Sequence, residues 1–264
     1  MKIDLNLCFP QLKEFIFHEE TIKNASICTV YNYYRDLILF FKYIKSIKKE
    51  TSTNNKIKDI DITDIDTKFL SSITYEDIEQ YFFYLKSVKN NNAATRKRRV
   101  ISLRNFFRFL NLTVEVIDSD PTKKLVTPKL NKSLPKFMLE EECIALLNSI
   151  DGTNKERDYC IFVLFINSGI RLSELVGLNY TDIDRQGNVV IRGKGNKERR
   201  IIFNKACLEA LAEYEKFKEI HYQNKERDRD AVFVGRTGKR LSARRIEQMV
   251  KQRITAAGFG GRAL

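Results

Sequence analysis

The stretch SGIRLSELVGLNYTDID, residues 168–184, joins the end of an apolar helix to a short second helix and carries one arginine at the joint. Gly169 suits the left-handed conformation that ends many helices, because glycine adopts positive φ without steric cost. Arg171 is therefore predicted to begin the helix RLSELVGL, where free backbone N–H groups and the helix dipole favour an anion. Three apolar residues of this helix are expected to face the core: Leu172, Leu175 and Val176.

Glu174 follows Arg171 by three residues, which places both side chains on one face of the predicted helix. Taken alone, such a pair on a protein surface contributes little stability. A guanidinium held by a carboxylate is also suited to bidentate contact with a phosphate, which the point charge of a lysine is not. From this stretch by itself, Arg171 can be either half of an ordinary surface ion pair or a phosphate-binding residue.

The stretch NVVIRGKGNKERRIIF, residues 188–203, predicts a β-hairpin. Two β-branched runs flank residues 193–197, where Gly195-Asn196 supplies turn residues, so Lys194 and Lys197 are expected to project from the turn. The segment is not a nucleotide-binding loop, because it has neither GxxxxGK[ST] nor GxGxxG at the start of a helix. By itself it also fits an ordinary basic surface turn.

The chain divides near its middle into two regions. Residues 112–137 hold three of the four prolines and show no helical period, which predicts an interdomain linker. The region before it is predicted to be helical, and the region after it is predicted to be α+β with the hairpin. Helices are expected at 7–20, 26–46, 75–88, 93–110, 139–150, 155–168, 171–178, 204–219 and 242–256.

The charge of the chain indicates a polyanionic partner. The sequence has 47 Lys plus Arg against 34 Asp plus Glu, a formal net charge of +13, which favours nucleic acid or an anionic membrane surface. The longest apolar run, residues 159–166, is far shorter than the roughly 20 residues that a membrane-spanning helix needs. The N-terminus has no apolar signal-peptide core. We expect a soluble, cytoplasmic protein that binds nucleic acid.

Part of this charge gathers beside the apolar stripe of the predicted helix 93–110. Residues 96–136 contain 11 basic and 3 acidic residues, a net charge of +8. An ordinary solvated helix also carries lysine and arginine, but a cluster suits phosphate backbones better than a uniform coat does. The apolar stripe consists of Val100, Leu103, Phe106, Phe107 and Leu110. The predicted DNA contacts are Lys97, Arg104, Arg108, Lys123, Lys124, Lys197, Arg240, Arg244 and Arg245.

The sequence does not predict a metal centre. The two histidines, His18 and His221, lie in neither HExxH nor HxxxH spacing. The five cysteines include no CxxC pair, and their odd number argues against a disulfide framework. We expect small buried cysteines, no metal and no cofactor.

Taken together, the two motifs and the basic helix resemble the tyrosine recombinases of the phage integrase family, closest to its Xer-type branch. The resemblance covers nearly the whole chain. It implies an α-helical, SAM-like core-binding domain over 1–111, a linker over 112–137, and over 138–264 a mainly α, α+β catalytic domain with a small β-hairpin. In the family, the arginine of the GxRxxEL motif contacts the scissile phosphate, and the hairpin lysine is the general acid toward the leaving 5′-hydroxyl. By motif these residues are Arg171 and Lys194, with Glu174 as structural support.

The chemistry that this resemblance implies is DNA strand cleavage and rejoining without metal. A tyrosine hydroxyl attacks the phosphate and forms a 3′-phosphotyrosyl link, which stores the bond energy for rejoining. Fixed arginines can meet the charge on the phosphoryl oxygens in place of metal ions. The implied partners are double-stranded DNA and, in the full-length form, further recombinase protomers on that DNA.

The sequence departs from the family pattern near its end. The family continues from the last basic helix into a His-x-x-Arg box and then the nucleophilic tyrosine, whereas this sequence ends FGGRAL and its last tyrosine is Tyr222. We therefore expect an incomplete catalytic domain that binds DNA without cutting it. Three interpretations stay open: a fragment of a DNA-cleaving recombinase or integrase, a non-cleaving DNA-binding accessory protein, and a nucleic-acid-binding protein unrelated to recombination.

Overall fold

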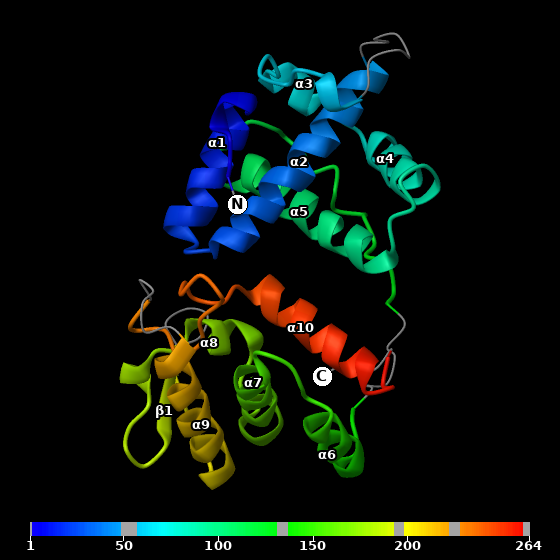
Figure 1. Ribbon diagram of the computed structural model, residues 1–264. Coiled ribbons are helices and arrows are strands. Elements are labelled where there is room, and N and C mark those ends of the chain that lie inside the picture. The colour runs from blue at the N-terminus through cyan, green and yellow to red at the C-terminus, as the bar shows by residue number, and fades with distance from the viewer. Residues whose placement is uncertain (1, 49–56, 131–136, 193–197, 222–227, 261–264) are drawn as a thin grey trace. The chain divides into compact units, whose positions relative to one another are not determined.

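The computed structural model describes residues 2–48, 57–130, 137–192, 198–221 and 228–260 (Figure 1). The chain forms two compact units, Met1–Lys132 and Ser133–Leu264.

The first unit is helical. Its two longest elements, α2 (Ile27–Lys48) and α5 (Ala93–Leu112), pack against each other. Helix α5 begins at a regular cap, because the Asn92 side chain accepts a hydrogen bond from the backbone of Thr95 at 2.8 Å. The shorter elements are η1 (Leu5–Leu7), α1 (Pro10–Phe17), the π-helical turn η2 (His18–Ile22), η3 (Ile57–Asp59), α3 (Thr67–Ser71) and α4 (Tyr75–Ser87).

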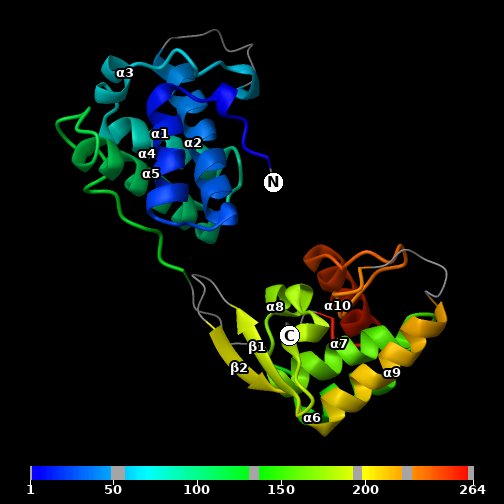
Figure 2. The same cartoon turned by 90° about the vertical axis from the view of Figure 1, so that its left-hand side faces the viewer.

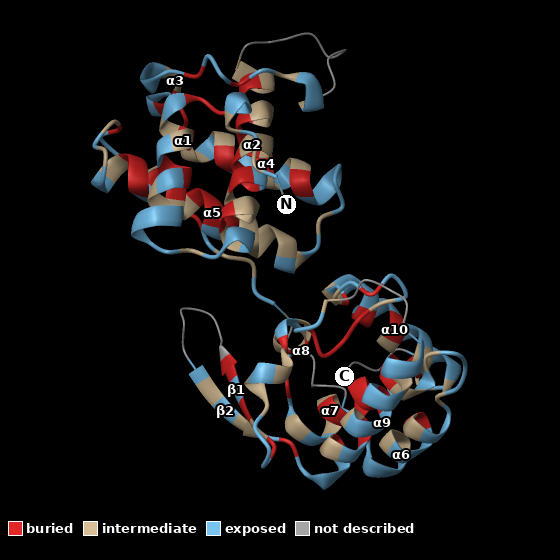
Figure 3. Cartoon of the chain, turned by 60° about the vertical axis from the view of Figure 1, so that its left-hand side comes forward, coloured by how far each residue is buried: buried red, intermediate tan, exposed pale blue. Residues whose placement is uncertain are grey.

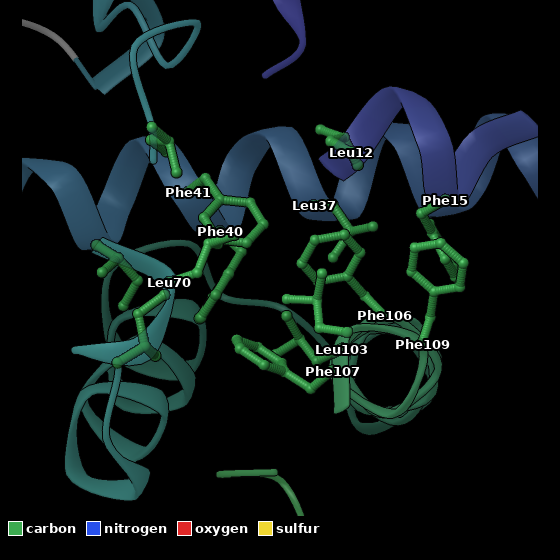
Figure 4. Packing of buried hydrophobic residues seen from close by; sticks show 14 of the residues in the cluster. Leu12, Phe15, Leu37, Phe40, Phe41, Leu70, Leu103, Phe106, Phe107 and Phe109 are labelled. Atoms are coloured by element: carbon green, nitrogen blue, oxygen red, sulfur yellow. The ribbon is translucent and has the colours of Figure 1, made fainter. Parts of the chain in front are cut away.

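An aromatic core fixes the orientation of α5. The five residues of its predicted apolar stripe are each at most 1% exposed, so this prediction is confirmed. Figure 4 shows Phe106 and Phe107 of α5 together with Phe40 and Phe41 of α2. Ring centroids lie 5.4 Å apart for Phe41 and Phe106 and 6.0 Å apart for Phe40 and Phe107, both edge to face. Such pairs add to the burial energy and hold the helix in one rotation about its axis.

A buried acidic residue ties α5 to α2 a second time. Asp36 of α2 is 2% exposed and accepts a hydrogen bond from Ser102 at 2.8 Å. It also pairs with Arg98 and Arg99, and Arg99 donates to the hydroxyl of Tyr81 at 3.0 Å. Burial raises the pKa of Asp36, while Ser102 and the two arginines lower it in part. These two arginines of the basic run 96–99 therefore serve the interior of the unit.

The segment predicted as a linker, 112–137, packs against the first unit over its first part. Ile117 and Leu125 are both 6% exposed and belong to the core of that unit. Asn111 donates to the carbonyl of Ile117 at 2.9 Å, and the guanidinium of Arg104 donates to the carbonyl of Leu125. Residues 131–136 lie outside the described part of the chain.

The second unit is built around α7 (Lys155–Ser168), which packs against α9 (Lys205–His221). The strands β1 (Asn188–Arg192) and β2 (Glu198–Ile202) pair antiparallel, with Val190 opposite Arg200 (Figure 2). Figure 3 shows buried residues on α7 and on β1. The remaining elements are α6 (Glu140–Asn148), α8 (Leu172–Gly177), η4 (Tyr180–Asp182) and α10 (Ala243–Ala256). The prediction of a mainly helical fold with a small antiparallel hairpin is confirmed.

The cysteines differ in part from the prediction. Three of them are buried, but Cys28 is exposed and Cys143 is intermediate, so the expectation of small buried residues is wrong for these two. Cys28 lies in the first turn of α2, before that helix enters the core. In the described ranges, no three His, Cys, Asp or Glu side chains gather as a metal site would require. No described helix is long and apolar enough to cross a membrane.

Candidate functional site

Arg171 lies at the boundary between α7 and α8. Gly169 ends α7 in the left-handed conformation, with φ 59° and ψ 28°, so the predicted glycine cap is confirmed. Helix α8 begins at Leu172, and Arg171 is its N-cap residue in an extended conformation. This sharp change of chain direction presents Arg171 at the surface, where its side chain is 68% exposed.

Glu174 holds Arg171 in place. Its carboxylate accepts a hydrogen bond from the backbone N–H of Arg171 at 2.8 Å and another from Nη1 at 2.9 Å. The side chain of Glu174 is only 5% exposed. One edge of the guanidinium is therefore fixed by the protein, and its remaining N–H groups are left for an external anion.

Arg199 of β2 binds the same carboxylate, and the sequence analysis missed it as a site residue. Its Nη2 lies 2.7 Å from Oε2 of Glu174 and its Nε lies 3.3 Å from Oε1. Nη2 also donates to the carbonyl of Gly169 at 3.3 Å. Along β2, Arg199 and Ile201 are half-buried between exposed neighbours. The sequence ERRII does not itself alternate between polar and apolar residues, so it carries no signal that separates Arg199 from Arg200.

The hydrogen bonds keep Glu174 ionised. Burial raises the pKa of its carboxyl group, but hydrogen bonds from Arg199 and Arg171 outweigh burial and lower the pKa from 4.5 to about 2. Two guanidinium groups thus share one carboxylate, which leaves the cluster of Arg171, Glu174 and Arg199 with a net positive charge. The cluster attracts an anion at every pH at which the protein is expected to be folded.

An apolar hollow of about 550 Å³ lies beside Arg171. Walls of low polarity strengthen the attraction between a fixed cation and an anion that lies against them. The hollow is formed by the end of α7, the start of α8 and the face of α10. It is lined by Phe165, Gly169, Ile170, Arg171, Leu172, Ile246, Glu247 and Val250.

Two of the predicted site residues have no described geometry. Lys194 and Lys197 fall within residues 193–197, which lie outside the described residues, between β1 and β2 in the sequence. The general-acid role of Lys194 therefore stays a prediction.

The other predicted DNA contacts differ in exposure. Arg104 and Lys97 are half-buried, and Arg104 is fixed to the carbonyl of Leu125. Basic side chains at the surface are the ones that can reach a phosphate without breaking internal bonds. The exposed set consists of Arg108, Lys123 and Lys124 of the first unit and of Arg244 and Arg245 of the second.

Arg240 does not fit the predicted role as a DNA contact. Its Nη1 donates to the carbonyls of Val176 at 3.0 Å and Leu178 at 3.1 Å, and its Nη2 donates to the side chain of Asn179 at 2.6 Å. Its Nε lies 3.3 Å from Asp228. Each nitrogen of the guanidinium is thus engaged within the protein, so we assign Arg240 to holding the end of α8 against the turn that precedes α10.

Comparisons with known proteins agree with these motifs. Residues 136–262 match the Phage integrase family. The tyrosine recombinase XerC of Caldanaerobacter subterraneus subsp. tengcongensis is 37% identical over 253 residues, which cover 96% of this chain and 70% of that protein. XerC of Chlamydia caviae is 30% identical over 253 residues, which cover 94% and 79%.

Solved structures show the same fold at lower identity. The XerH site-specific recombinase in a post-cleavage complex with palindromic difH substrate has a TM-score of 0.67 at 20% identity, and the match covers 97% of this chain and 70% of that one. A lambda integrase dimer (75–356) bound to a COC′ core site has a TM-score of 0.64 at 16% identity, and the match covers 96% and 79%.

Proposed function

The chain belongs to the phage integrase family, whose members similar to it are tyrosine recombinases, and we propose from this that it binds duplex DNA in site-specific recombination. The observation that carries the proposal is the cluster of Arg171, Glu174 and Arg199. An exposed guanidinium is held by an ionised, buried carboxylate at the edge of an apolar hollow. Such a group is built to receive a phosphate and has no evident purpose in the core of the unit.

In the proposed reaction, Arg171 binds the scissile phosphate. Negative charge on the phosphoryl oxygens develops further in the transition state, and a guanidinium already fixed in position stabilises it without reorganising. Glu174 and Arg199 do not touch the substrate in this proposal, because their hydrogen bonds are made to each other and to Arg171. They are positioning residues. Lys194 is proposed as the general acid on the family resemblance alone.

The exposed cations are proposed to contact the phosphate backbone from both units. Arg108, Lys123 and Lys124 lie on the first unit, and Arg244 and Arg245 lie at the start of α10 in the second. The structural neighbours XerH and lambda integrase are described as bound to their DNA substrates, and one lambda integrase structure is a tetramer on a Holliday junction. We extend to this chain both the duplex DNA and the assembly of further protomers on it.

Salt dependence tests the DNA-binding part of the proposal. The logarithm of the association constant falls by about 0.9 for each neutralised phosphate per decade of salt, so several contacts give a steep slope. Fluorescence anisotropy with a labelled duplex measures it. Arg171→Lys is expected to change affinity by less than about threefold, because the exposed cations supply most of the binding. A flat salt dependence would contradict the proposal.

We further propose that these 264 residues bind DNA without cleaving it. The reaction needs a tyrosine nucleophile beyond the helix equivalent to α10, and the last tyrosine of this sequence, Tyr222, precedes α10. Incubation with an end-labelled, nicked duplex followed by a denaturing gel is expected to show no protein-linked band. A linked band that disappears in Tyr222→Phe would overturn this part and leave DNA binding intact.

The roles of Arg171 and Lys194 are separable in a form of the protein that carries a nucleophile. Arg171→Lys is expected to abolish strand cleavage, since lysine cannot make the bidentate contact. Lys194→Ala is expected to slow cleavage as well, but a 5′-phosphorothiolate substrate, whose leaving group needs little protonation, should restore it. Equal rescue of both variants, or of neither, would remove the acid role from Lys194.

A further inference from the structure

A second hollow, of about 500 Å³, lies in the same unit and shares none of its described lining residues with the hollow beside Arg171. Three guanidinium groups from three segments line it: one from α7, one from the turn before α10 and one from α10 itself. None of the described lining residues is acidic. They are Thr153, Asn154, Arg157, Gly235, Arg236, Thr237, Leu241 and Arg245.

Arg157 is the buried member of this set. Its side chain is only 8% exposed, and its Nη2 and Nε donate to Oδ1 of Asp158 at 2.7 and 3.0 Å. Among the described residues Nη1 has no acceptor, yet it is not one of the buried polar atoms that are sealed from solvent. Arg157 lines the hollow, so its guanidinium can offer this remaining donor at the wall of the hollow. A buried guanidinium with a spare donor at a cavity wall suits an anionic ligand.

The charge balance around Arg157 leaves the hollow positive. Oδ2 of Asp158 accepts from Arg253 at 2.9 Å, and Arg253 also pairs with Asp151 at 2.8 Å. The negative charges of Asp151 and Asp158 therefore balance the positive charges of Arg157 and Arg253. Arg245 is exposed and forms no ion pair within the described ranges, so no described carboxylate balances its charge.

Polar groups suited to oxyanions surround these cations. Asn154 is the N-cap residue of α7 but makes no side-chain hydrogen bond to the helix. The backbone N–H of Lys155 donates to the carbonyl of Gly152 at 3.2 Å, so the N–H groups of the next two residues are the ones that keep their capacity to donate. Thr153 and Thr237 add hydroxyl groups. Guanidinium, hydroxyl and helix N–H groups together are the donors that bind tetrahedral phosphate.

We propose that this hollow binds a phosphate group, with Arg157 and Arg245 as its principal ligands. The ligand is a phosphoryl group with at least one negative charge, and either the DNA backbone or free phosphate can supply it. If DNA supplies it, the inference rests on the proposed function and adds Arg157 to the DNA contacts. If free phosphate supplies it, the hollow is a site for a small anion that is independent of DNA.

The first arm of the test uses pyrophosphate, titrated into the full chain and followed by isothermal titration calorimetry. Arg245→Gln is expected to weaken binding about tenfold, since it removes a charge-assisted donor. Arg244→Gln is the matched control: it is exposed in the same helical turn but does not line the hollow, so binding should change less than about twofold. Equal losses in both variants would overturn the proposal, because they would mean diffuse surface charge.

Arg157→Lys tests the buried ligand without removing its charge. The lysine keeps the charge and can still pair with Asp158, but it lacks the planar fork that lets arginine bind a carboxylate through Nε and Nη2 and a second anion through Nη1. We expect weaker phosphate binding with a melting temperature within a few degrees of the wild type. Unchanged phosphate binding in a folded Arg157→Lys protein would overturn the role of Arg157.

The second arm identifies the source of the phosphate. Single methylphosphonate substitutions, which neutralise one phosphate each, are scanned along a duplex that the protein binds. One methylphosphonate position should remove the phosphate that lies in the hollow. On that modified duplex, Arg245→Gln should cause no further loss of duplex affinity, whereas Arg244→Gln should still lower it. Binding of pyrophosphate without such a position assigns the site to free phosphate.

The two proposals fail separately in this design. A chain that binds no DNA contradicts the proposed function, and the pyrophosphate arm still decides whether the hollow is a phosphate site. A chain that binds DNA but shows neither pyrophosphate binding nor a coupled methylphosphonate position contradicts only the inference about the hollow.

Discussion

Replacing Glu174 by glutamine is expected to destabilise the second unit by an amount that depends on pH. The pKa of Glu174 falls from 4.5 to about 2 on folding. At about 1.4 kcal/mol for each pKa unit this corresponds to about 3 kcal/mol. Because Arg171 is 68% exposed, solvent screening reduces our expectation to about 2 kcal/mol.

The sign of the pH dependence follows from the lowered pKa in the folded state. The contribution of Glu174 is fully present above pH 4.5 and is lost as the pH falls from about 4.5 toward 2. The difference in unfolding free energy between wild type and Glu174→Gln should therefore be about 2 kcal/mol at pH 7 and shrink toward zero in acid. Urea unfolding of the full chain at pH 7, 5 and 3 measures it, with hydrogen exchange assigning the transition of the second unit.

Glu213→Gln is the matched control for this experiment. Glu213 pairs with Lys216 at 2.9 Å, but both side chains are more than 60% exposed, so its removal should cost less than about 0.5 kcal/mol. A cost for Glu174→Gln that is equal to that of the control, or that stays constant from pH 7 to pH 3, would refute the reasoning that the two arginines hold this carboxylate ionised.

Three further variants test other parts of the structure. Gly187→Ala should destabilise the second unit by about 2 kcal/mol in urea unfolding, because Gly187 has φ +83° and a Cβ there would lie 2.6 Å from the carbonyl oxygen of Phe203. The control Gly177→Ala should not lower the stability, because a Cβ at Gly177 would have open space around it. Asp36→Ala should lower the stability of the first unit by about 2 kcal/mol, since Ser102 and the partly buried Arg99 lose their acceptor; a melting temperature within 2 °C of the wild type would contradict this. Arg240→Gln should lower the melting temperature while duplex affinity, measured by anisotropy, changes less than about twofold.

The sequence predicted the elements that depend on local pattern. The stripe from Val100 to Leu110 has the spacing of a helix face, and the helix is buried on that face. Gly169 marked the end of α7 because few other residues adopt positive φ cheaply. The pairing of Glu174 with Arg171 followed from their spacing of three residues, although Arg171 is the N-cap residue of α8 and not part of its first turn as predicted.

Contacts between segments that are distant in the sequence could not be predicted from sequence patterns. Arg199 binds Glu174 across 25 positions, and only the folded arrangement of the second unit brings the two side chains together. Arg240 looked like a surface cation, because the backbone carbonyls that it binds leave no trace in the sequence. Ile117 and Leu125 are isolated apolar residues without a period, so their burial against the first unit was not predicted.

The packing of the segment up to Leu125 against the first unit shortens the tether between the two units. From Val126 to Leu139, before α6 begins, only 14 residues remain. Fully extended they span at most about 50 Å. If both units bind DNA, the protein is a bivalent ligand: once one unit is bound, the other stays within that radius at an effective concentration that reaches the millimolar range for short tethers. Avidity of this kind raises the affinity of the chain without any new contact, and lengthening the tether alone would weaken it.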